Sequence, residues 1–167
     1  MDFLTINFIT MLTIFVGYLS FIIGKYGILP SISESYYRLP KSINFLFTLF
    51  CWGFALPAVI IGVDLTDNFL MFLAGSGIMF VGAAAAFKET LTKNVHMIGA
   101  AVGIICAQLS TAFDFHMYYV NVIFVVLSLA ILLGKYLGKI KNYVWWIEIL
   151  AFILMCYVLG TQLFKLL

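Results

Sequence analysis

Charged residues are scarce in this sequence of 167 residues: Asp, Glu, Lys and Arg together make up 10% of it, against about 25% in an average soluble domain. Hydrophobic residues make up 65%, and the mean hydropathy is +1.15. A chain this short cannot hide so much apolar surface from water. The composition therefore excludes a soluble enzyme, a nucleic-acid-binding protein and a disordered tail. It indicates an integral membrane protein with a single domain over residues 1–167.

Groupings of residues that would carry metal or covalent chemistry are also lacking. Cys51, Cys106 and Cys156 are isolated within apolar runs and form no CxxC motif, so we predict neither a disulfide nor a metal cluster. His116 follows His96 by twenty residues, about 30 Å along a helix, so the two cannot share one metal ion. No GxSxG motif accompanies the serines. We therefore predict no cofactor and assign no catalytic residue.

Long apolar runs dominate what is present. A hydrocarbon core about 30 Å thick requires roughly 20 helical residues, and six runs of that kind occur. They are continuous and do not alternate between two faces, which favours helices over strands. We predict an all-α fold, a polytopic bundle of six transmembrane helices with short loops. Only the first connection, residues 30–42, is long enough for structure of its own. The predicted spans are residues 4–27, 43–63, 68–88, 95–113, 117–138 and 143–165.

The basic residues predict an orientation. Eight of the nine lie in or beside the first, third and fifth connections, and the ninth, Lys165, lies on the opposite side. By the positive-inside rule the odd connections face the cytoplasm and both termini face away from it. No basic segment precedes the first apolar run, so we expect a retained span rather than a signal peptide. The eight are Lys25, Arg38, Lys41, Lys88, Lys93, Lys135, Lys139 and Lys141.

Small residues predict where helices pack closely. The fourth span has a small residue at every fourth position, including Gly99 and Gly103, and this pattern lets a neighbouring backbone approach. We expect its partner surface on the third span, from Gly75, Gly82 and residues 83–86. The alternative is that Gly99 and Gly103 form the face of a homo-oligomer.

Glu148 is the clearest charged residue within a span. It lies six residues after Asn142, about 9 Å along the predicted helix. A carboxylate at that depth must be protonated, paired or solvated by a cavity. One interpretation is a functional carboxylate, and the other is an interfacial Glu paired with a nearby Lys beside Trp145 and Trp146.

Other polar residues belong to the same membrane face as Glu148 by topology. His96 opens the fourth span and is either part of a proton-sharing cluster with glutamates or an interfacial capping residue. Arg38 and Lys41 of the first connection would hold an anionic headgroup. We therefore hypothesise a polar pocket at this face, lined by Ser33, Glu34, Arg38, Glu89, His96 and Glu148.

Several short motifs follow one another in order: Ile32-Ser33-Glu34 before Pro40, then Gly77-Ile78-Met79-Phe80-Val81 leading to Phe87-Lys88-Glu89, then Val95-His96 before Gly99-Ala100. This order resembles the DRAM/Frag/Sfk family of six-span eukaryotic membrane proteins. The resemblance implies that Glu148 corresponds to a Glu in the family's last span. It also implies a link to lipid-anchor remodelling, phosphoinositide-related processes or autophagy. Glu34 replaces the family's Asp, and the family's first loop is thought to face the lumen, opposite to the orientation expected from charge.

The leading functional hypothesis is that the chain binds or organises membrane lipid through this pocket. One alternative is a lipid-modifying enzyme that uses His96 with Glu89 or Glu148 as a base for acyl transfer or hydrolysis. Another is a small transporter or pore-forming oligomer with Glu148 as an ion or proton site. We expect no nucleic-acid partner, and a homo-oligomer or a partner membrane subunit remains open.

Overall fold

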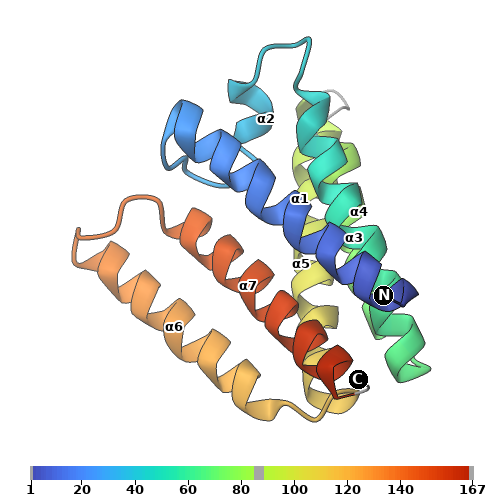
Figure 1. The fold of residues 1–167 in the computed structure, drawn as a ribbon. Helices are drawn as coiled ribbons and strands as arrows, with labels where there is room; N and C mark the ends of the chain where they lie inside the picture. The colour runs from blue at the N-terminus through green and yellow to red at the C-terminus, as the bar shows by residue number, and fades with distance from the viewer. Residues whose placement is uncertain (1, 85–88, 166–167) are drawn as a thin grey trace.

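A computed structural model describes residues 2–84 and 89–165 of the chain (Figure 1). The described residues form seven helices and contain no strand, in agreement with the predicted all-α class. The helices are α1 (Phe3–Tyr26), α2 (Ser35–Arg38), α3 (Phe45–Thr66), α4 (Leu70–Ala84), α5 (Glu89–Phe113), α6 (Tyr118–Tyr136) and α7 (Tyr143–Phe164).

Five of the helices are long and apolar enough to cross a membrane: α1, α3, α5 from Val95 onward, α6 and α7. Helix α4 is apolar but is described over only 15 residues, about 22 Å, which is shorter than a hydrocarbon core. The predicted third span, residues 68–88, ends outside the described residues. The helical bundle is therefore confirmed, and the number of six spans stays a prediction.

Helix α5 begins earlier than the sequence predicted. The fourth span was expected to start at residue 95, after a polar connection, but the helix starts at Glu89. The predicted span of residues 95–113 is confirmed as the part of α5 that is long and apolar enough to cross a membrane. The helix extends beyond it because hydropathy detects where a chain becomes apolar, whereas a polar segment can continue the same helix. The prediction that the first connection has structure of its own is confirmed by the single turn of α2.

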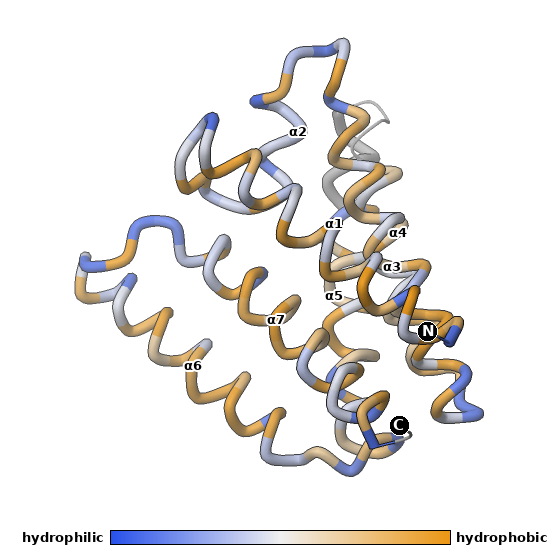
Figure 2. The backbone as a smooth tube through the Cα atoms, in the orientation of Figure 1, coloured by the Kyte–Doolittle hydropathy of each residue, from blue (hydrophilic) through white to orange (hydrophobic). Residues whose placement is uncertain are grey.

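Polar side chains join the connections at each end of the bundle. At one end, Asn142 of the α6–α7 connection donates to the carbonyl of Ile28 after α1, at 2.8 Å. At the other, Asn68 before α4 donates to Asp114 after α5, at 2.7 Å. The two chain termini lie near this second end (Figure 1). Hydrophilic residues concentrate in the connections, while the helices between them are apolar (Figure 2).

An aromatic cluster joins α1, α3 and α7 in the core. Phe152 of α7 stacks on Phe15 of α1 at 5.4 Å between ring centroids, and it meets Phe54 of α3 edge-on at 4.7 Å. On the next turns, Tyr18 of α1 stacks on Phe50 of α3 at 4.4 Å. These rings remove a large apolar area from the surroundings and fix the three helices side by side.

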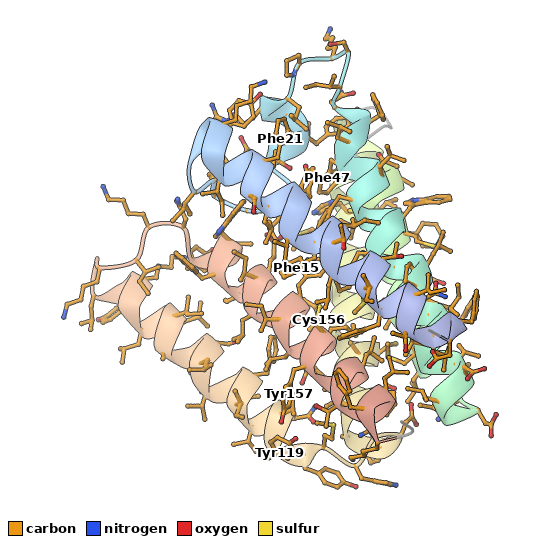
Figure 3. The ribbon with its side chains drawn as sticks, in the orientation of Figure 1. Phe15, Phe21, Phe47, Tyr119, Cys156 and Tyr157 are labelled. Atoms are coloured by element: carbon orange, nitrogen blue, oxygen red, sulfur yellow. The ribbon has the colours of Figure 1, made fainter. Side chains whose placement is uncertain are left out.

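Helix α6 is the outermost element. Val120 is its one buried residue, and most of its apolar side chains are exposed. It packs chiefly against α7 (Figure 1). The hydroxyls of Tyr119 and Tyr157 lie 3.1 Å apart and join the two helices toward the end of the bundle where the chain termini lie (Figure 3). An apolar surface of this extent is stable in hydrocarbon and not in water.

The glycines of α4 face two different neighbours. Gly99 and Gly103 of α5 lie against α4 as expected, but the α4 glycine that meets them is Gly77. Gly75 and Gly82 lie against α3 instead, so the expectation that they face the fourth span is wrong. Residues two apart on a helix point about 200° apart, which places positions 75 and 77 on nearly opposite faces. Of the other expected partners, residues 85 and 86 lie outside the described residues.

Helix α4 also occupies the surface that was considered as an alternative face for oligomers. A side chain at Gly99 would approach the carbonyl oxygen of Gly77 to 3.0 Å, and one at Gly103 would approach that of Ala74 to 3.3 Å. The small residues of α5 therefore serve packing within the chain.

Candidate functional site

The connection between α1 and α3 folds back over the start of α7. Helix α1 ends at Gly27, whose φ of 73° is readily reached by glycine and lets the chain reverse direction. Three residues later, the carbonyl of Pro30 accepts a hydrogen bond from the main-chain amide of Trp145 at 3.2 Å. Trp145 itself is fully buried. The connection is thus attached to the first turn of α7.

Ile32 is held through both of its main-chain polar groups. Its amide donates to Oε2 of Glu148 at 2.5 Å, and its carbonyl accepts from Oγ of Ser35 at 2.5 Å. The Tyr18 hydroxyl lies 2.6 Å from the same Ser35 oxygen. Because the Ser35 proton is directed to the carbonyl of Ile32, Tyr18 is the donor in this pair. The buried chain of contacts fixes the connection against both α1 and α7.

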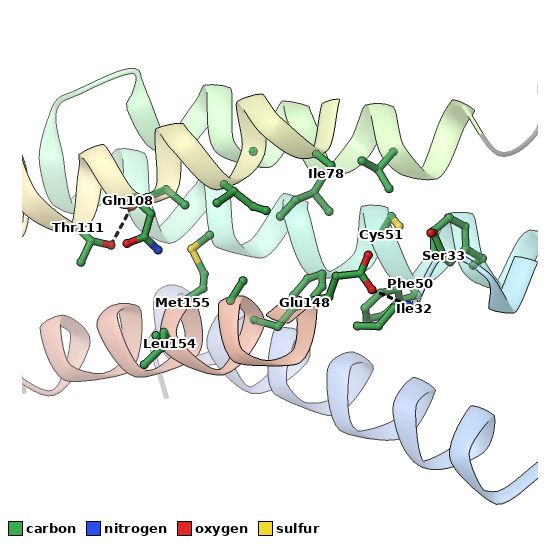
Figure 4. Close-up of a pocket in the computed structure, with 18 of the residues that line it drawn as sticks. Ile32, Ser33, Phe50, Cys51, Ile78, Gln108, Thr111, Glu148, Leu154 and Met155 are labelled. Atoms are coloured by element: carbon green, nitrogen blue, oxygen red, sulfur yellow. Dashed lines mark hydrogen bonds between the residues drawn. The ribbon is translucent and has the colours of Figure 1, made fainter. Parts of the chain in front are cut away.

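A cavity of about 100 Å³ lies beneath this connection, between α3, α4, α5 and α7 (Figure 4). One water molecule requires roughly 10–15 Å³ of such space, so the cavity is several times larger than a single water site. Its lining residues are Ile32, Ser33, Phe47, Phe50, Cys51, Ile78, Val81, Ala100, Gly103, Ile104, Ala107, Gln108, Thr111, Val120, Glu148, Ala151, Phe152, Leu154 and Met155.

The cavity is long and mostly apolar. On α5 its lining runs from Ala100 to Thr111, a rise of eleven positions or about 16 Å, which is half the thickness of a hydrocarbon core. Glu148, Ser33 and Cys51 lie together at one end (Figure 4). Gln108 lies with Thr111 at the other end, and the walls between the two ends are apolar.

Helical spacing directs Glu148 into this space. Ala151, Phe152 and Met155 follow it at three, four and seven positions and also line the cavity, so they share one face of α7. Oε2 of Glu148 is engaged by the Ile32 amide, and Figure 4 shows the other carboxylate oxygen directed into the cavity. That second oxygen accepts no hydrogen bond from the residues that the structure describes. A carboxylate at membrane depth is costly unless it is protonated, paired or hydrogen-bonded.

Most polar groups at the far end have hydrogen-bond partners, while Oδ1 of Asn121 is buried without one among the described residues. Asn121 of α6 donates to the carbonyl and to Oε1 of Gln108, at 2.8 and 2.9 Å. The Thr111 hydroxyl donates to the carbonyl of Ala107 at 2.8 Å. The two ends of the cavity therefore differ. One end carries the Glu148 carboxylate with an open acceptor oxygen, and the other end carries neutral amide and hydroxyl groups.

Of the six residues hypothesised to line a polar pocket, Ser33 and Glu148 line this cavity. Glu34, which is half-buried, and Arg38, which is exposed, form an ion pair with each other at 3.4 Å. The remaining two, His96 and Glu89, lie on α5.

His96 does not line the cavity. It lies against α4, within hydrogen-bonding reach of the Val81 main chain. The side chain of Glu89 lies outside the described part of the structure. The hypothesised residues therefore do not converge on one point in the described structure, and Glu148 is the one carboxylate that faces the cavity.

Sequence reasoning missed three contributors to the site: the Ile32 amide, Cys51 and Gln108. A main-chain amide carries no signal in the sequence, and Cys51 was considered only for disulfide and metal chemistry. Gln108 had a detectable signal, because it follows Ala100 and Ile104 at four-residue spacing and so shares a helical face with them.

Among the described residues, no three His, Cys, Asp or Glu side chains are grouped as a metal ion would require. No protein-family model, curated protein or solved structure matches the chain. The function is therefore argued from the geometry of the cavity.

Proposed function

We propose that the chain is an integral membrane protein that binds lipid, holding one acyl chain in the cavity with its polar end at Glu148 and Ser33. The observation that carries this proposal is the shape and polarity of the cavity. It is about 16 Å long, has apolar walls, and has its acidic group at one end. An aliphatic chain with a polar terminus complements a site of this kind.

The membrane setting supports a lipid as the occupant. Five helices are long and apolar enough to span a bilayer, and the cavity lies between helices of this group. The Glu148 end lies under the α1–α3 connection, at the end of the bundle that carries most of the basic residues. Arg38 and Lys41 are exposed there and suit the anionic surface of a cytoplasmic leaflet. We accordingly propose that this end faces the cytoplasm.

Retention of lipid during purification tests the proposal. The chain is extracted in detergent, and the lipid that stays bound is quantified by mass spectrometry. Ala100→Phe places a ring in the cavity, because Ala100 is one of its lining residues. Ala101→Phe is the matched control: it makes the same change one position along α5, at an exposed site outside the cavity.

We expect wild type and Ala101→Phe to retain equal amounts of a lipid species and Ala100→Phe to lose most of it. Thermal unfolding of each variant checks that the fold persists, and Ala107→Phe repeats the test if Ala100→Phe does not fold. Equal retention by all folded variants would contradict lipid binding in the cavity. A change in the chemical species of the lipid, instead of its amount, would favour the enzymatic alternative.

A further inference from the structure

We infer that the ligand is a single-chain amphiphile whose small head carries a hydrogen-bond donor, an amine or a hydroxyl, that binds the open carboxylate oxygen of Glu148. This inference rests on the proposed lipid binding and names the class of lipid. It adds a chemical requirement at one end of the cavity, which the apolar walls do not impose.

The first observation is the asymmetric environment of the Glu148 carboxylate. Oε2 is bound to the Ile32 amide, while the second oxygen is directed into the cavity (Figure 4). The nearest polar lining groups at this end are Ser33 on the connection and Cys51 on α3. The Ser33 hydroxyl lies 3.0 Å from that of Ser31, so it already has a partner. A thiol is a weak donor, which leaves the carboxylate to be matched by a donor on the ligand.

The second observation is the size of the space. A cavity of about 100 Å³ that extends over about 16 Å is narrow. It therefore admits a narrow aliphatic segment with a small head. It has no room for two acyl chains or for a phosphate-bearing head, so a diacyl phospholipid is excluded as the occupant.

The third observation concerns charge. No described Lys or Arg lines the cavity, so an anionic head at the Glu148 end would face the carboxylate oxygens with no basic group to compensate it. A donor head, by contrast, gains a charge-assisted hydrogen bond in surroundings of low dielectric constant. The geometry thus favours an amine or alcohol over a fatty acid.

Three probes with the same chain and different heads test the inference: dodecylamine, dodecanol and dodecanoate. Each is added at equal mole fraction to the purified full chain in detergent micelles, and the bound fraction is measured by native mass spectrometry. We expect the affinity for dodecylamine and for dodecanol to be at least about tenfold higher than the affinity for dodecanoate. This is the ratio expected for one hydrogen bond to a charged group.

Glu148→Gln is the decisive variant because its amide oxygen can still accept from the Ile32 amide, so the connection stays attached. It removes the negative charge, and we expect the preference over dodecanoate to fall to about twofold or less, since the charge-assisted part of the bond is lost. Glu34→Gln is the control, because it makes the same change at a surface carboxylate paired with Arg38. That variant is expected to keep the wild-type preference.

The outcomes separate the two proposals. Equal binding of all three heads that is blocked by Ala100→Phe would overturn the inference about the head and leave lipid binding in place. An unchanged preference in Glu148→Gln would also overturn it. Failure of every probe to bind, together with no retained lipid in the wild type, would overturn the proposed function itself.

Discussion

The carboxylate of Glu148 accepts a hydrogen bond from the main-chain amide of Ile32, 116 positions earlier in the sequence, at 2.5 Å. This contact attaches the α1–α3 connection to α7 and, at the same time, orients the carboxylate at the end of the cavity. One residue thus closes the structure at this end and, in the proposed function, supplies the acceptor for the ligand.

Replacing Glu148 by leucine is expected to destabilise the fold. The Ile32 amide would be left buried without its acceptor, which costs about 1–3 kcal/mol. Glu148→Gln retains an acceptor for this amide, so we expect it to lose less stability than Glu148→Leu. The free energy of unfolding in mixed micelles measures both. Equal stability of the leucine variant and the wild type would show that the contact does not hold the connection.

Tyr18 and Ser35 are expected to be energetically coupled. Their hydroxyl oxygens lie 2.6 Å apart, and Ser35 is fully buried. Tyr18→Phe removes the donor to Ser35, and we expect a loss of about 1 kcal/mol. In a double-mutant cycle with Ser35→Ala the two losses should not add. Tyr37→Phe, at an exposed tyrosine, should stay within about 0.5 kcal/mol of wild type, and additive losses at Tyr18 and Ser35 would contradict the contact.

Gly77 is the glycine at which a methyl group should be least tolerated between α4 and α5. A Cβ there would lie 2.5 Å from the carbonyl oxygen of Gly99 and 2.6 Å from the amide nitrogen of Gly103. Backbone atoms cannot move aside without separating the helices, so Gly77→Ala is expected to cost about 1–3 kcal/mol of unfolding free energy.

Gly17→Ala is the matched control, because nothing lies within 4 Å of an added Cβ at that position. Alanine is the better helix former, so this variant should gain up to about 1 kcal/mol. If both alanine variants shifted the unfolding free energy in the same direction, the close approach at Gly77 would be refuted.

The start of α1 should depend on pH through Asp2. Its side chain accepts from the amide and hydroxyl of Thr5, at 2.7 and 3.1 Å, and these bonds lower the pKa of Asp2 below its ordinary value of 3.8. A lowered folded-state pKa stabilises the helix end above pH 3.8, and the stabilisation is lost as the pH falls through the folded-state pKa.

Amide hydrogen exchange at Thr5 measures this dependence, and protection should fall at low pH. Asp2→Asn keeps a capping oxygen without a titrating group, so its protection, corrected for the intrinsic exchange rate, should not change over the same range. Identical pH profiles for the two proteins would exclude the ionised cap.

The proposed orientation is tested by labelling single cysteines with a membrane-impermeant maleimide. The native Cys51, Cys106 and Cys156 are buried and give a low background. Lys139→Cys and Asp64→Cys introduce exposed thiols at opposite ends of the bundle. Reagent outside intact cells is expected to label Asp64→Cys alone, and labelling of Lys139→Cys alone would reverse the orientation.

The helices were largely predictable because apolar length is a property of the sequence itself. Most ends of the predicted spans lie within three residues of the corresponding helix ends. Glu148 was identified because a charged residue within an apolar run is energetically costly. Which face each helix presents was harder to predict. Gly75 and Gly77 are the same residue type, so the sequence does not distinguish them. Only the three-dimensional arrangement shows that Gly75 lies against α3 and Gly77 against α5.

The candidate site was predicted only in part, again because the sequence does not show which way each side chain faces. Topology correctly assigns Ser33 and Glu148 to one end of the bundle, but it carries no information on depth or direction within that end. Arg38 points to the surface, and His96 lies against α4. The amide of Ile32 has no sequence signature at all, because every residue except proline carries such a group.

A photoreactive alkyl amine with a diazirine at the end of its chain tests the central claim most directly. After irradiation of the purified chain, peptide mass spectrometry locates the modified residues. With the amine at Glu148, the diazirine should modify residues toward the far end of the cavity, such as Gln108, Thr111 and Met155, and Ala100→Phe should abolish the modification. Modification confined to the exposed apolar face of α6, unchanged by Ala100→Phe, would contradict a lipid-binding cavity.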